Sequence, residues 1–369
     1  MKSLFPLIIT LFFAMIHYLS YTRIIAHLYI KTHTRNFLKY LLILNMIAII
    51  GYISSRYALS PPKFLYFLFS LSIGIGFLLF IGTIFYELLH LFQRLAPFSE
   101  EKRIFFKRTT DIGFLALGSG YIGAGVVGGC KNPIVKFVNV NQNRFGNKSY
   151  RIVQISDMHI GGLIDQEFVA KSVAMINQLK PDLIAITGDL SDAAVEVVKE
   201  AINELRHLKS RYGTYYIVGN HEYFHSISDT IAYLKTMDIH VLENSSLKID
   251  NFYIAGVYDL FGYRAGVYPP DITHAMKNIP LDAPTLLLAH QPKYIEYLEG
   301  FTPSLILSGH THGGQVWPFE YFVRLAQPYI KGLYSLGANR HIYVNSGIGF
   351  WGPPIRLNSQ AEITCITWS

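Results

Sequence analysis

Four long apolar stretches occupy the first third of the chain, at residues 4–21, 37–57, 64–91 and 112–129. Each is near or above the roughly 20 residues that a helix needs to cross a bilayer. A cleaved signal peptide could explain the first stretch by itself, but it would leave the next three unexplained. The fourth stretch is rich in glycine, which favours close packing of one helix against another. The pattern therefore predicts an all-α transmembrane region of about four helices within residues 1–130.

The pattern changes after residue 130. Residues 131–149 are polar and rich in asparagine, so we expect a linker there, in which residues 134–140 could form one edge strand. Helical spacing then appears at residues 166–179 and 193–208. Later strands are expected at residues 251–257, 341–345 and 363–368. Alternation of strands and helices, followed by clustered strands, indicates an α/β domain over residues 150–369.

Five short apolar runs end in Asp, Asn or His. The polar residues that follow them are Asp157 and His159, Asp189 and Asp192, Asn220 and His221, His290, and finally His310 and His312. Ligands bind outside the carboxyl ends of the strands in an open α/β sheet, so we expect these side chains to meet in one crevice. Any one of them could instead belong to a polar loop or cap a helix. Asp189, for instance, could cap a helix that starts near Ser191.

The order of these motifs resembles the calcineurin-like metallophosphoesterase superfamily. The motifs are Asp-X-His, Gly-Asp-X-X-Asp, Gly-Asn-His-Glu, a lone His at a strand end, and Gly-His-X-His. The resemblance covers about residues 150–369 and implies a four-layer α/β/β/α sandwich. Residues 309–315, 345–356 and 361–364 show a narrower similarity. They resemble a bacterial membrane-associated branch that includes twin-arginine-exported phosphodiesterases and UDP-2,3-diacylglucosamine pyrophosphatases.

The superfamily resemblance implies two divalent metal cations as cofactors. The ligands it implies are Asp157, His159 and His312 for one metal, Asn220, His290 and His310 for the other, and Asp189 as the bridge. Nitrogen and oxygen donors without a thiolate suit Mn, Fe, Zn or Co, and do not choose among them. His221 would be the catalytic acid, or would bind the phosphoryl group. Asp192 would orient a ligand histidine, or would cap the following helix.

Other residues carry a weaker signal. Arg264 and Arg356 could bind an anionic group, although a structural or solvated arginine is the commoner case. Trp317, Phe350 and Trp351 lie beside the motif loops in the sequence. They could form an apolar wall for acyl chains, or they could belong to the core, as aromatic residues usually do.

The charge is divided unequally along the chain. Residues 1–149 carry 16 Lys and Arg against 4 Asp and Glu, whereas residues 150–369 carry 16 against 21. The basic excess belongs to the membrane part, so we do not expect nucleic acid as a partner of the catalytic part. Glu87 and His90, near the end of the third apolar stretch, could be functional or could lie at the membrane interface. Cys130 and Cys365 could pair, or could pack as small apolar side chains.

Basic residues also predict the orientation in the membrane. Nine Lys and Arg occupy the first and third connecting loops, and two occupy the second. If the nine face the cytoplasm, everything after residue 129 lies outside it. Lys107-Arg108 before an apolar stretch resembles a twin-arginine export signal in which Lys replaces the first Arg. We therefore expect an integral protein of the bacterial inner membrane with its catalytic domain on the extracytoplasmic face.

These patterns predict three regions, which are transmembrane helices at residues 1–130, a linker at 131–149 and a catalytic domain at 150–369. The expected activity is hydrolysis of phosphodiester or pyrophosphate bonds by a membrane-anchored dinuclear phosphoesterase, with a lipid-linked or envelope compound as the substrate. One alternative is a UDP-2,3-diacylglucosamine-type pyrophosphatase at the cytoplasmic face. Another is an inactive membrane sensor or scaffold, against which the complete set of implied ligands argues.

Overall fold

The computed structural model describes residues 4–56 and 61–369. The chain forms two compact units. The first consists of Met1–Cys130 together with Gly352–Ile355, and the second consists of Lys131–Trp351 together with Arg356–Ser369. Cys130 and Cys365 are both free, so the two do not pair, and Cys365 is buried as a small side chain.

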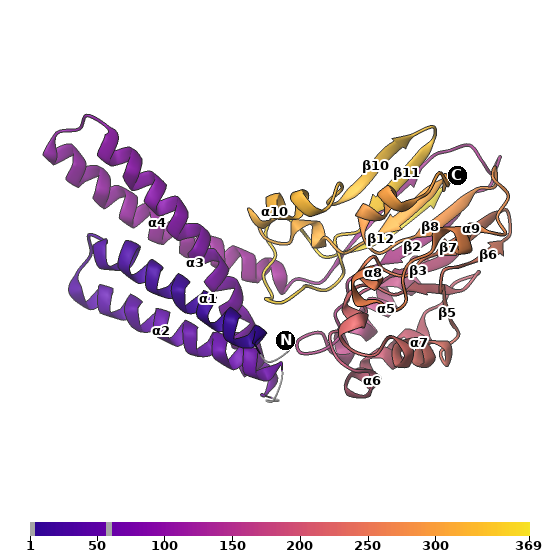
Figure 1. Cartoon of the computed structure of the whole chain (residues 1–369), viewed down its shortest axis with the longest axis horizontal. Coiled ribbons are helices and arrows are strands. Elements are labelled where there is room, and N and C mark those ends of the chain that lie inside the picture. Colours follow the sequence, from indigo (N-terminus) through magenta and orange to yellow (C-terminus); the bar gives the residue numbers. More distant parts are fainter. Residues whose placement is uncertain (1–3, 57–60) are drawn as a thin grey trace. The chain divides into compact units, whose positions relative to one another are not determined.

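The first unit is built from four long helices (Figure 1). They are α1 (Phe5–Leu19), α2 (Thr32–Ser55), α3 (Lys63–Leu95) and α4 (Glu100–Gly129). The chain continues from α1 through a π-helical turn, η1 (Ser20–Ile24), and a 3-10 turn, η2 (Ile25–His27). The segment Pro6–His27, which combines α1 with η1 and η2, and the helices α2, α3 and α4 are long and apolar enough to cross a membrane, as the sequence predicts. The expected end of the second stretch, Tyr57, lies outside the described residues.

Helix α4 differs from the expectation in two respects. It begins at Glu100, well before residue 112, because Ser99 has an extended backbone and Glu100 and Glu101 suit the positive end of a helix dipole. The prediction that the glycine-rich stretch packs closely against another helix is wrong at three positions. Within residues 4–56 and 61–369, no atom comes within 4 Å of a Cβ placed on Gly118, Gly120 or Gly123. These glycines therefore do not draw another part of the chain onto α4.

The second unit contains two six-stranded sheets. The first has the order β1-β12-β2-β3-β4-β5, with β1 (Ile134–Val140), β2 (Tyr150–Ile155), β3 (Leu183–Thr187), β4 (Thr214–Ile217), β5 (Ile239–Val241) and β12 (Glu362–Trp368). The second has the order β10-β11-β9-β8-β7-β6, with β6 (Ser245–Ile249), β7 (Phe252–Gly256), β8 (Thr285–Leu288), β9 (Leu305–Ser308), β10 (Gly332–Gly337) and β11 (Arg340–Val344). The edge strand expected at residues 134–140 is present as β1, which pairs in parallel with β12.

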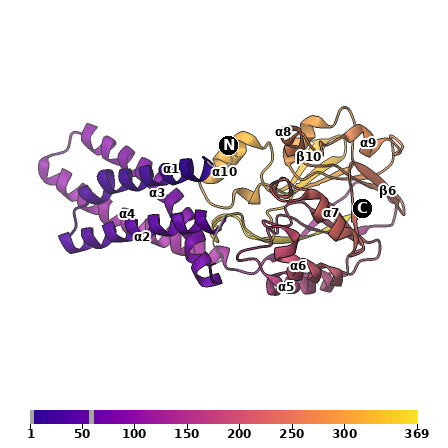
Figure 2. The same cartoon turned by 60° about the horizontal axis from the view of Figure 1, so that its bottom comes forward.

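Hydrophobic positions alternate between two cores in this unit. In β2, Ile152 belongs to the cluster between the two sheets, whereas Val153 belongs to the cluster under the helices of the first sheet. That helical layer contains α5 (Gln166–Gln178), α6 (Val195–Asn203) and α7 (Ile227–Lys235), and η3 (Glu204–His207) follows α6. The second sheet is covered by α9 (Ile272–Met276) and η5 (Pro292–Tyr297). Figure 2 shows α5 and α6 on one side of the strands and α9 on the other. The predicted α/β/β/α sandwich is therefore confirmed.

Strand direction places the motif loops together. Strands β2, β3 and β4 are mutually parallel in the first sheet, and β7, β8 and β9 are mutually parallel in the second. Their carboxyl ends therefore meet at one edge of each sheet, and the motif residues follow those ends.

Candidate metal centre

Five of the seven implied ligands have a backbone conformation that residues other than glycine rarely adopt. The φ angles are 52° at Asp157, 52° at His159, 51° at Asp189, 69° at His310 and 50° at His312. Left-handed conformations of such residues cost free energy, and they concentrate at functional sites, where the surroundings hold them in place. Each sharp turn directs its side chain into the space beyond the strand ends.

Glycines next to the ligands allow the loops to approach one another closely. A Cβ at Gly219 would overlap the backbone and the carboxylate of Asp189. A Cβ at Gly309 would overlap Ser156 and the carboxylate of Asp157. The glycines that precede Asn220 and His310 are therefore required for this packing.

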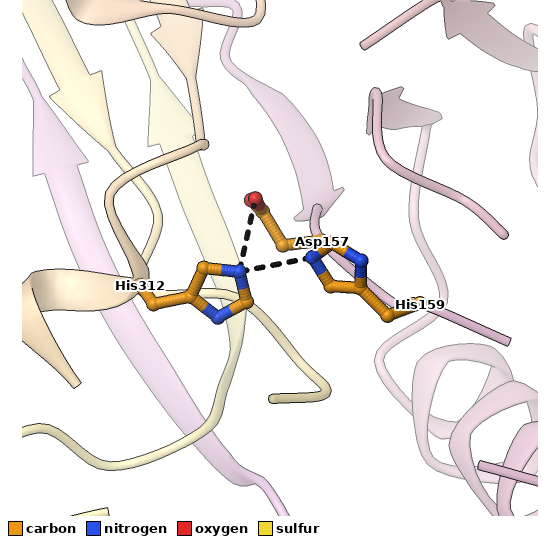
Figure 3. Close-up of side chains that lie close together, drawn as sticks. All are labelled: Asp157, His159 and His312. Carbon is orange, nitrogen blue, oxygen red and sulfur yellow. Dashed lines mark hydrogen bonds and ion pairs between the residues drawn. The ribbon is translucent and has the colours of Figure 1, made fainter. Parts of the chain in front are cut away.

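Asp157, His159 and His312 form a first group of potential ligands (Figure 3). The His159 and His312 Nε2 atoms are 3.0 Å apart. The Oδ1 atom of Asp157 lies 3.4 Å from His312 Nε2. All three residues are buried, so the group is enclosed by protein.

Asp189, His290 and His310 form a second group. His290 Nε2 lies 3.3 Å from Asp189 Oδ2 and 3.1 Å from Asn220 Oδ1. The rings of His290 and His310 are 5.1 Å apart between centroids and nearly perpendicular. Asn220 thus joins this group through its side-chain oxygen.

The Asp189 carboxylate faces both groups. Its Oδ2 atom lies 3.3 Å from His290 Nε2 in the second group and 3.9 Å from His159 Nε2 in the first. The same oxygen lies 3.9 Å from His221 Nε2. The structure therefore brings all seven implied ligands and His221 into one site, with Asp189 between the two groups.

The separations within each group suit a shared cation. Metal–ligand bonds of about 2.0–2.2 Å place neighbouring ligand atoms about 2.9–3.5 Å apart. The observed separations of 3.0, 3.1, 3.3 and 3.4 Å lie in that range. Clustered imidazoles and carboxylates of this kind suggest a divalent metal site, and they do not select one metal.

Hydrogen bonds at the other ring nitrogen orient two of the imidazoles. Asp192 Oδ1 accepts from His159 Nδ1 at 2.7 Å, and the Thr187 carbonyl accepts from His290 Nδ1 at 2.7 Å. Because both acceptors require a proton on Nδ1, the neutral rings present the lone pair of Nε2 to the site. Protein groups therefore fix the tautomer that metal binding requires.

Asp192 also holds His221. Its Oδ1 atom accepts from His221 Nδ1 at 2.7 Å, and the backbone N–H of His221 donates to Asp189 Oδ1 at 2.8 Å.

The N-cap residue of α6 is Ala194. The helix-cap alternatives for Asp189 and Asp192 are therefore wrong, because the helix starts too late for either.

Burial and mutual charge shift the pKa values of these groups. Burial raises the pKa of Asp157. Burial opposes ionisation of Asp189 as well, but His290 and His221 outweigh it and hold the pKa of Asp189 well below its usual range. Burial and the neighbouring His290 lower the pKa of His310 to about 3, so His310 is neutral and able to bind a metal. Burial disfavours the charged form of His221, but Asp189 and Asp192 overcome this and raise its pKa to about 9.

Glu222 is a buried residue to which the sequence assigned no role. It lies in η4 (His221–Phe224), and its carboxylate accepts from the backbone N–H groups of Gly219 at 2.7 Å and Leu190 at 2.8 Å. The N–H of Asp189 donates to the same carboxylate at 3.2 Å. Glu222 therefore ties the loop after β3 to the loop after β4. Its place in the Gly-Asn-His-Glu motif was the available signal.

The contacts of Arg356 indicate a structural role. Its guanidinium is buried and donates to the carbonyls of Ser346 at 2.8 Å and Gly349, and it lies 3.4 Å from His312 Nδ1. Burial lowers its pKa to about 10, which still leaves it charged at neutral pH. Arg264, by contrast, is exposed on α8 (Phe261–Ala265).

Two exposed aromatic rings flank His221. Trp351 is 50% exposed and its ring lies 6.4 Å from that of His221, while Phe224 is 60% exposed at 5.7 Å. The side-chain amide of Gln315 holds the backbone of Trp351. It donates to the Trp351 carbonyl and accepts from the Trp351 N–H, both at 3.0 Å. Phe350, in contrast, packs against the core of the first sheet. The sequence assigned no role to Phe224, three residues after His221 in η4, or to Gln315.

Known proteins resemble this chain over the same region and beyond it. Residues 150–314 match the calcineurin-like phosphoesterase family. An uncharacterised metallophosphoesterase of Helicobacter pylori is 37% identical over 304 residues, which is 82% of each chain. One of Campylobacter jejuni is 36% identical over 257 residues, which is 69% of this chain and 68% of that one.

A third relative is named for membrane spans. It is a bovine transmembrane protein with metallophosphoesterase domain, 35% identical over 258 residues, which is 65% of this chain and 58% of the bovine one. The family implies metal-dependent hydrolysis of phosphoesters, in keeping with the clustered histidines and aspartates. Together with the fold, these similarities show that the chain belongs to the calcineurin-like metallophosphoesterase family.

Proposed function

We propose that this chain is a membrane-anchored, dinuclear phosphoesterase. Two groups of side chains that face the same Asp189 carboxylate carry this proposal. In the proposed centre, Asp157, His159 and His312 would hold one cation, Asn220, His290 and His310 would hold the other, and Asp189 would contribute to both. Two cations in this position would polarise the phosphoryl group and lower the pKa of a bound water.

His221 is the proposed catalytic acid. Asp192 accepts from its Nδ1, so its Nε2 faces the same space as Asp189 Oδ2. A protonated Nε2 can donate to the leaving oxygen as the phosphoester bond breaks. Asp192 also holds His159, so one carboxylate aligns the proposed acid with a proposed ligand.

We further propose that the substrate is a lipid-linked or envelope phosphodiester or pyrophosphate. Four helices that are able to cross a membrane keep the enzyme close to such compounds. The exposed rings of Trp351 and Phe224, both close to His221, offer an apolar surface for the group attached to the leaving oxygen. The resemblance of residues 309–315, 345–356 and 361–364 to the twin-arginine-exported and UDP-2,3-diacylglucosamine branch supports the same class of substrate, and the bovine relative named as a transmembrane protein supports a membrane location, which we propose to be the bacterial inner membrane.

The metal centre is tested with the purified full-length chain. The wild type is expected to contain two divalent cations per chain by elemental analysis and to hydrolyse a chromogenic phosphodiester. Asp189→Ala should lose both cations and all activity, because the bridge holds both. Asp282→Ala, an exposed carboxylate away from the site, is the matched control and should behave as the wild type. Full activity in Asp189→Ala, or a metal-free and inactive wild type, would reject the proposal, and the latter would favour a scaffold.

The substrate class is tested with the aromatic pair. Trp351→Ala and Phe224→Ala should lower turnover of a long-chain phospholipid in mixed micelles by about tenfold, since each ring buries apolar substrate surface. Turnover of a small soluble phosphodiester should change by less than about twofold. Tyr321→Ala, which removes an exposed ring from α10 (Phe319–Ala326), is the control. An equal loss on both substrates would argue against an apolar substrate group.

A further inference from the structure

A second cavity, unrelated to the metal centre, lies within the helical unit. Its volume is about 270 Å³. The end of the first helical segment, the last turns of α3 and the first turns of α4 form its walls. In Figure 1 the α1–α2 and α3–α4 connections lie at the same end of this unit. Pockets for drug-sized ligands measure about 300–1,000 Å³, so this cavity suits a small polar group more than a whole lipid.

The lining of this cavity is strongly basic. Its positively charged or potentially charged residues are Arg23, His27, His90, Arg94, Arg103 and Lys107. Glu87 is the one carboxylate among the described lining residues. A second carboxylate, Asp111, lies buried behind the wall and accepts from Lys107 at 3.0 Å. Positive charge therefore remains in excess after both carboxylates are counted.

The wall of the cavity is held in place by its own hydrogen bonds. Asp111 accepts from the hydroxyl of Tyr86 at 2.7 Å and from the backbone N–H of Tyr29 at 2.7 Å. These bonds join α3, α4 and the connection after η2. Arg103 donates to the carbonyls of Gln93 and Ala96, which end α3. The basic groups are therefore presented by a fixed framework and need little rearrangement to bind a ligand.

Two guanidinium groups of the lining are available to a ligand, and one buried imidazole nitrogen of the lining has no hydrogen-bond partner among the described residues. Within residues 4–56 and 61–369, neither Arg23 nor Arg94 makes a hydrogen bond or ion pair through its guanidinium, and both are exposed. His90 Nε2 is buried and has no hydrogen-bond partner there, with the nearest Asp111 oxygen at 3.7 Å. Arg23 lies in the π-helical turn η1, and π-helical turns within α-helices are frequent at functional sites.

We propose that this cavity binds a phosphate group. Guanidinium groups recognise phosphate oxygens in a bidentate manner, and basic pockets between membrane helices bind lipid headgroups. The phosphate can belong to an anionic phospholipid or to a free inorganic anion, and both present the same chemistry. Glu87 and His90 then have a place in a functional site, which was one of the two alternatives for them in the sequence.

Native mass spectrometry of the detergent-purified full-length chain tests this site. The Asp189→Asn background is used throughout, so that binding is measured whether or not the chain hydrolyses the lipid. The chain should retain phosphatidylglycerol in preference to phosphatidylcholine. Arg23→Gln combined with Arg94→Gln should weaken retention of phosphatidylglycerol at least about tenfold, because two charge-assisted bonds are lost. Both residues are exposed, so the helical circular dichroism should not change.

The matched control is Lys31→Gln combined with Lys102→Gln. It removes the same charge from exposed residues next to the same two connections, outside the lining, and should change retention less than about twofold. Displacement of phosphatidylglycerol by millimolar inorganic phosphate would identify a free anion as the ligand, and resistance to displacement would identify the lipid headgroup. Equal retention of both lipids, or equal loss in the two double variants, would overturn the inference.

Discussion

Asp192 accepts hydrogen bonds from two imidazoles whose proposed tasks differ. His159 Nδ1 and His221 Nδ1 both lie 2.7 Å from its Oδ1 atom. The bond to His159 fixes the tautomer that can bind a metal, whereas the bond to His221 fixes the direction of a proton donor. Asp192 therefore supports both metal binding and proton transfer. A substitution that affects only one of these functions has to be made at one of the two histidines.

His221→Ala provides that separation. The substitution removes the proposed proton donor and leaves the seven proposed ligands in place, so bound metal should stay at the wild-type level. Turnover should fall by about 10²–10⁴, the usual contribution of a positioned acid. Elemental analysis and steady-state kinetics on the same preparation measure both quantities. His207→Ala, an exposed histidine at the end of η3, is the control. Loss of metal together with activity would show that His221 has a different task.

Single site residues could be predicted from the sequence where a motif directly follows the end of a strand. His310 and His312 follow a buried strand and a glycine, so their meeting with Asp157 could be anticipated. Gln315 could not be found in this way, because its role depends on a partner far away in the sequence. Gln315 acts on Trp351, which lies 36 positions further along the chain.

At the scale of elements, the five strands that precede the motif residues were predicted as short apolar runs. Each is a short, mainly apolar run that is buried except at Arg151 in β2, which gives a strong pattern. β5, β6 and β10 were not predicted. β5 and β6 lie at sheet edges and are short, and β10 is a half-exposed edge strand with glycine at both ends. Their register is set by pairing with neighbours rather than by a local pattern.

Glu222 joins two of the elements that were predicted separately. Because its carboxylate accepts from backbone N–H groups of both the β3 and the β4 loops, Glu222→Gln replaces an acceptor by an amide group that faces donors. We expect a loss of about 1–3 kcal/mol of stability, the cost of leaving buried donors unsatisfied. We also expect weaker metal binding, since Asp189 belongs to the β3 loop.

Thermal unfolding and competition with a chelator measure these two effects. Glu196→Gln, an exposed carboxylate in the first turn of α6, is the matched control and should change neither. An unchanged chelator titration in a destabilised Glu222→Gln would mean that the tie supports the fold without holding the metal loop.

At the scale of the whole molecule, the charge division agrees with the two compact units. The first unit, which contains the four apolar helices, carries 12 Lys and Arg against 4 Asp and Glu, whereas the second unit, which contains the two sheets, carries 20 against 21 and is nearly neutral. The sequence could locate this division because hydropathy and charge are properties of long segments. It could not locate the basic cavity, since its lining comes from three separate helical segments that meet only in the folded unit.

The side of the membrane that carries the metal centre decides which substrates can reach it. Nine Lys and Arg in the first and third connections, against Arg56 and Lys63 in the second, predict that residues after 129 face away from the cytoplasm. Helix α4 is long and apolar enough to be the fourth span that this orientation requires. An alkaline phosphatase fusion at Ser369 should therefore be active, and a green fluorescent protein fusion at Ser369 should be dark.

A fusion after Glu101, in the first turn of α4 and before its apolar stretch, is the internal control and should give the opposite pair of results, because it lies one span earlier. If the fusion at Ser369 instead fluoresces and its alkaline phosphatase partner is inactive, α4 does not cross and the metal centre faces the cytoplasm. Nucleotide-linked lipids, such as UDP-2,3-diacylglucosamine, would then become the reachable substrates, while the proposed metal chemistry would stay the same. The fusion pair therefore separates the two substrate classes without any assumption about the site itself.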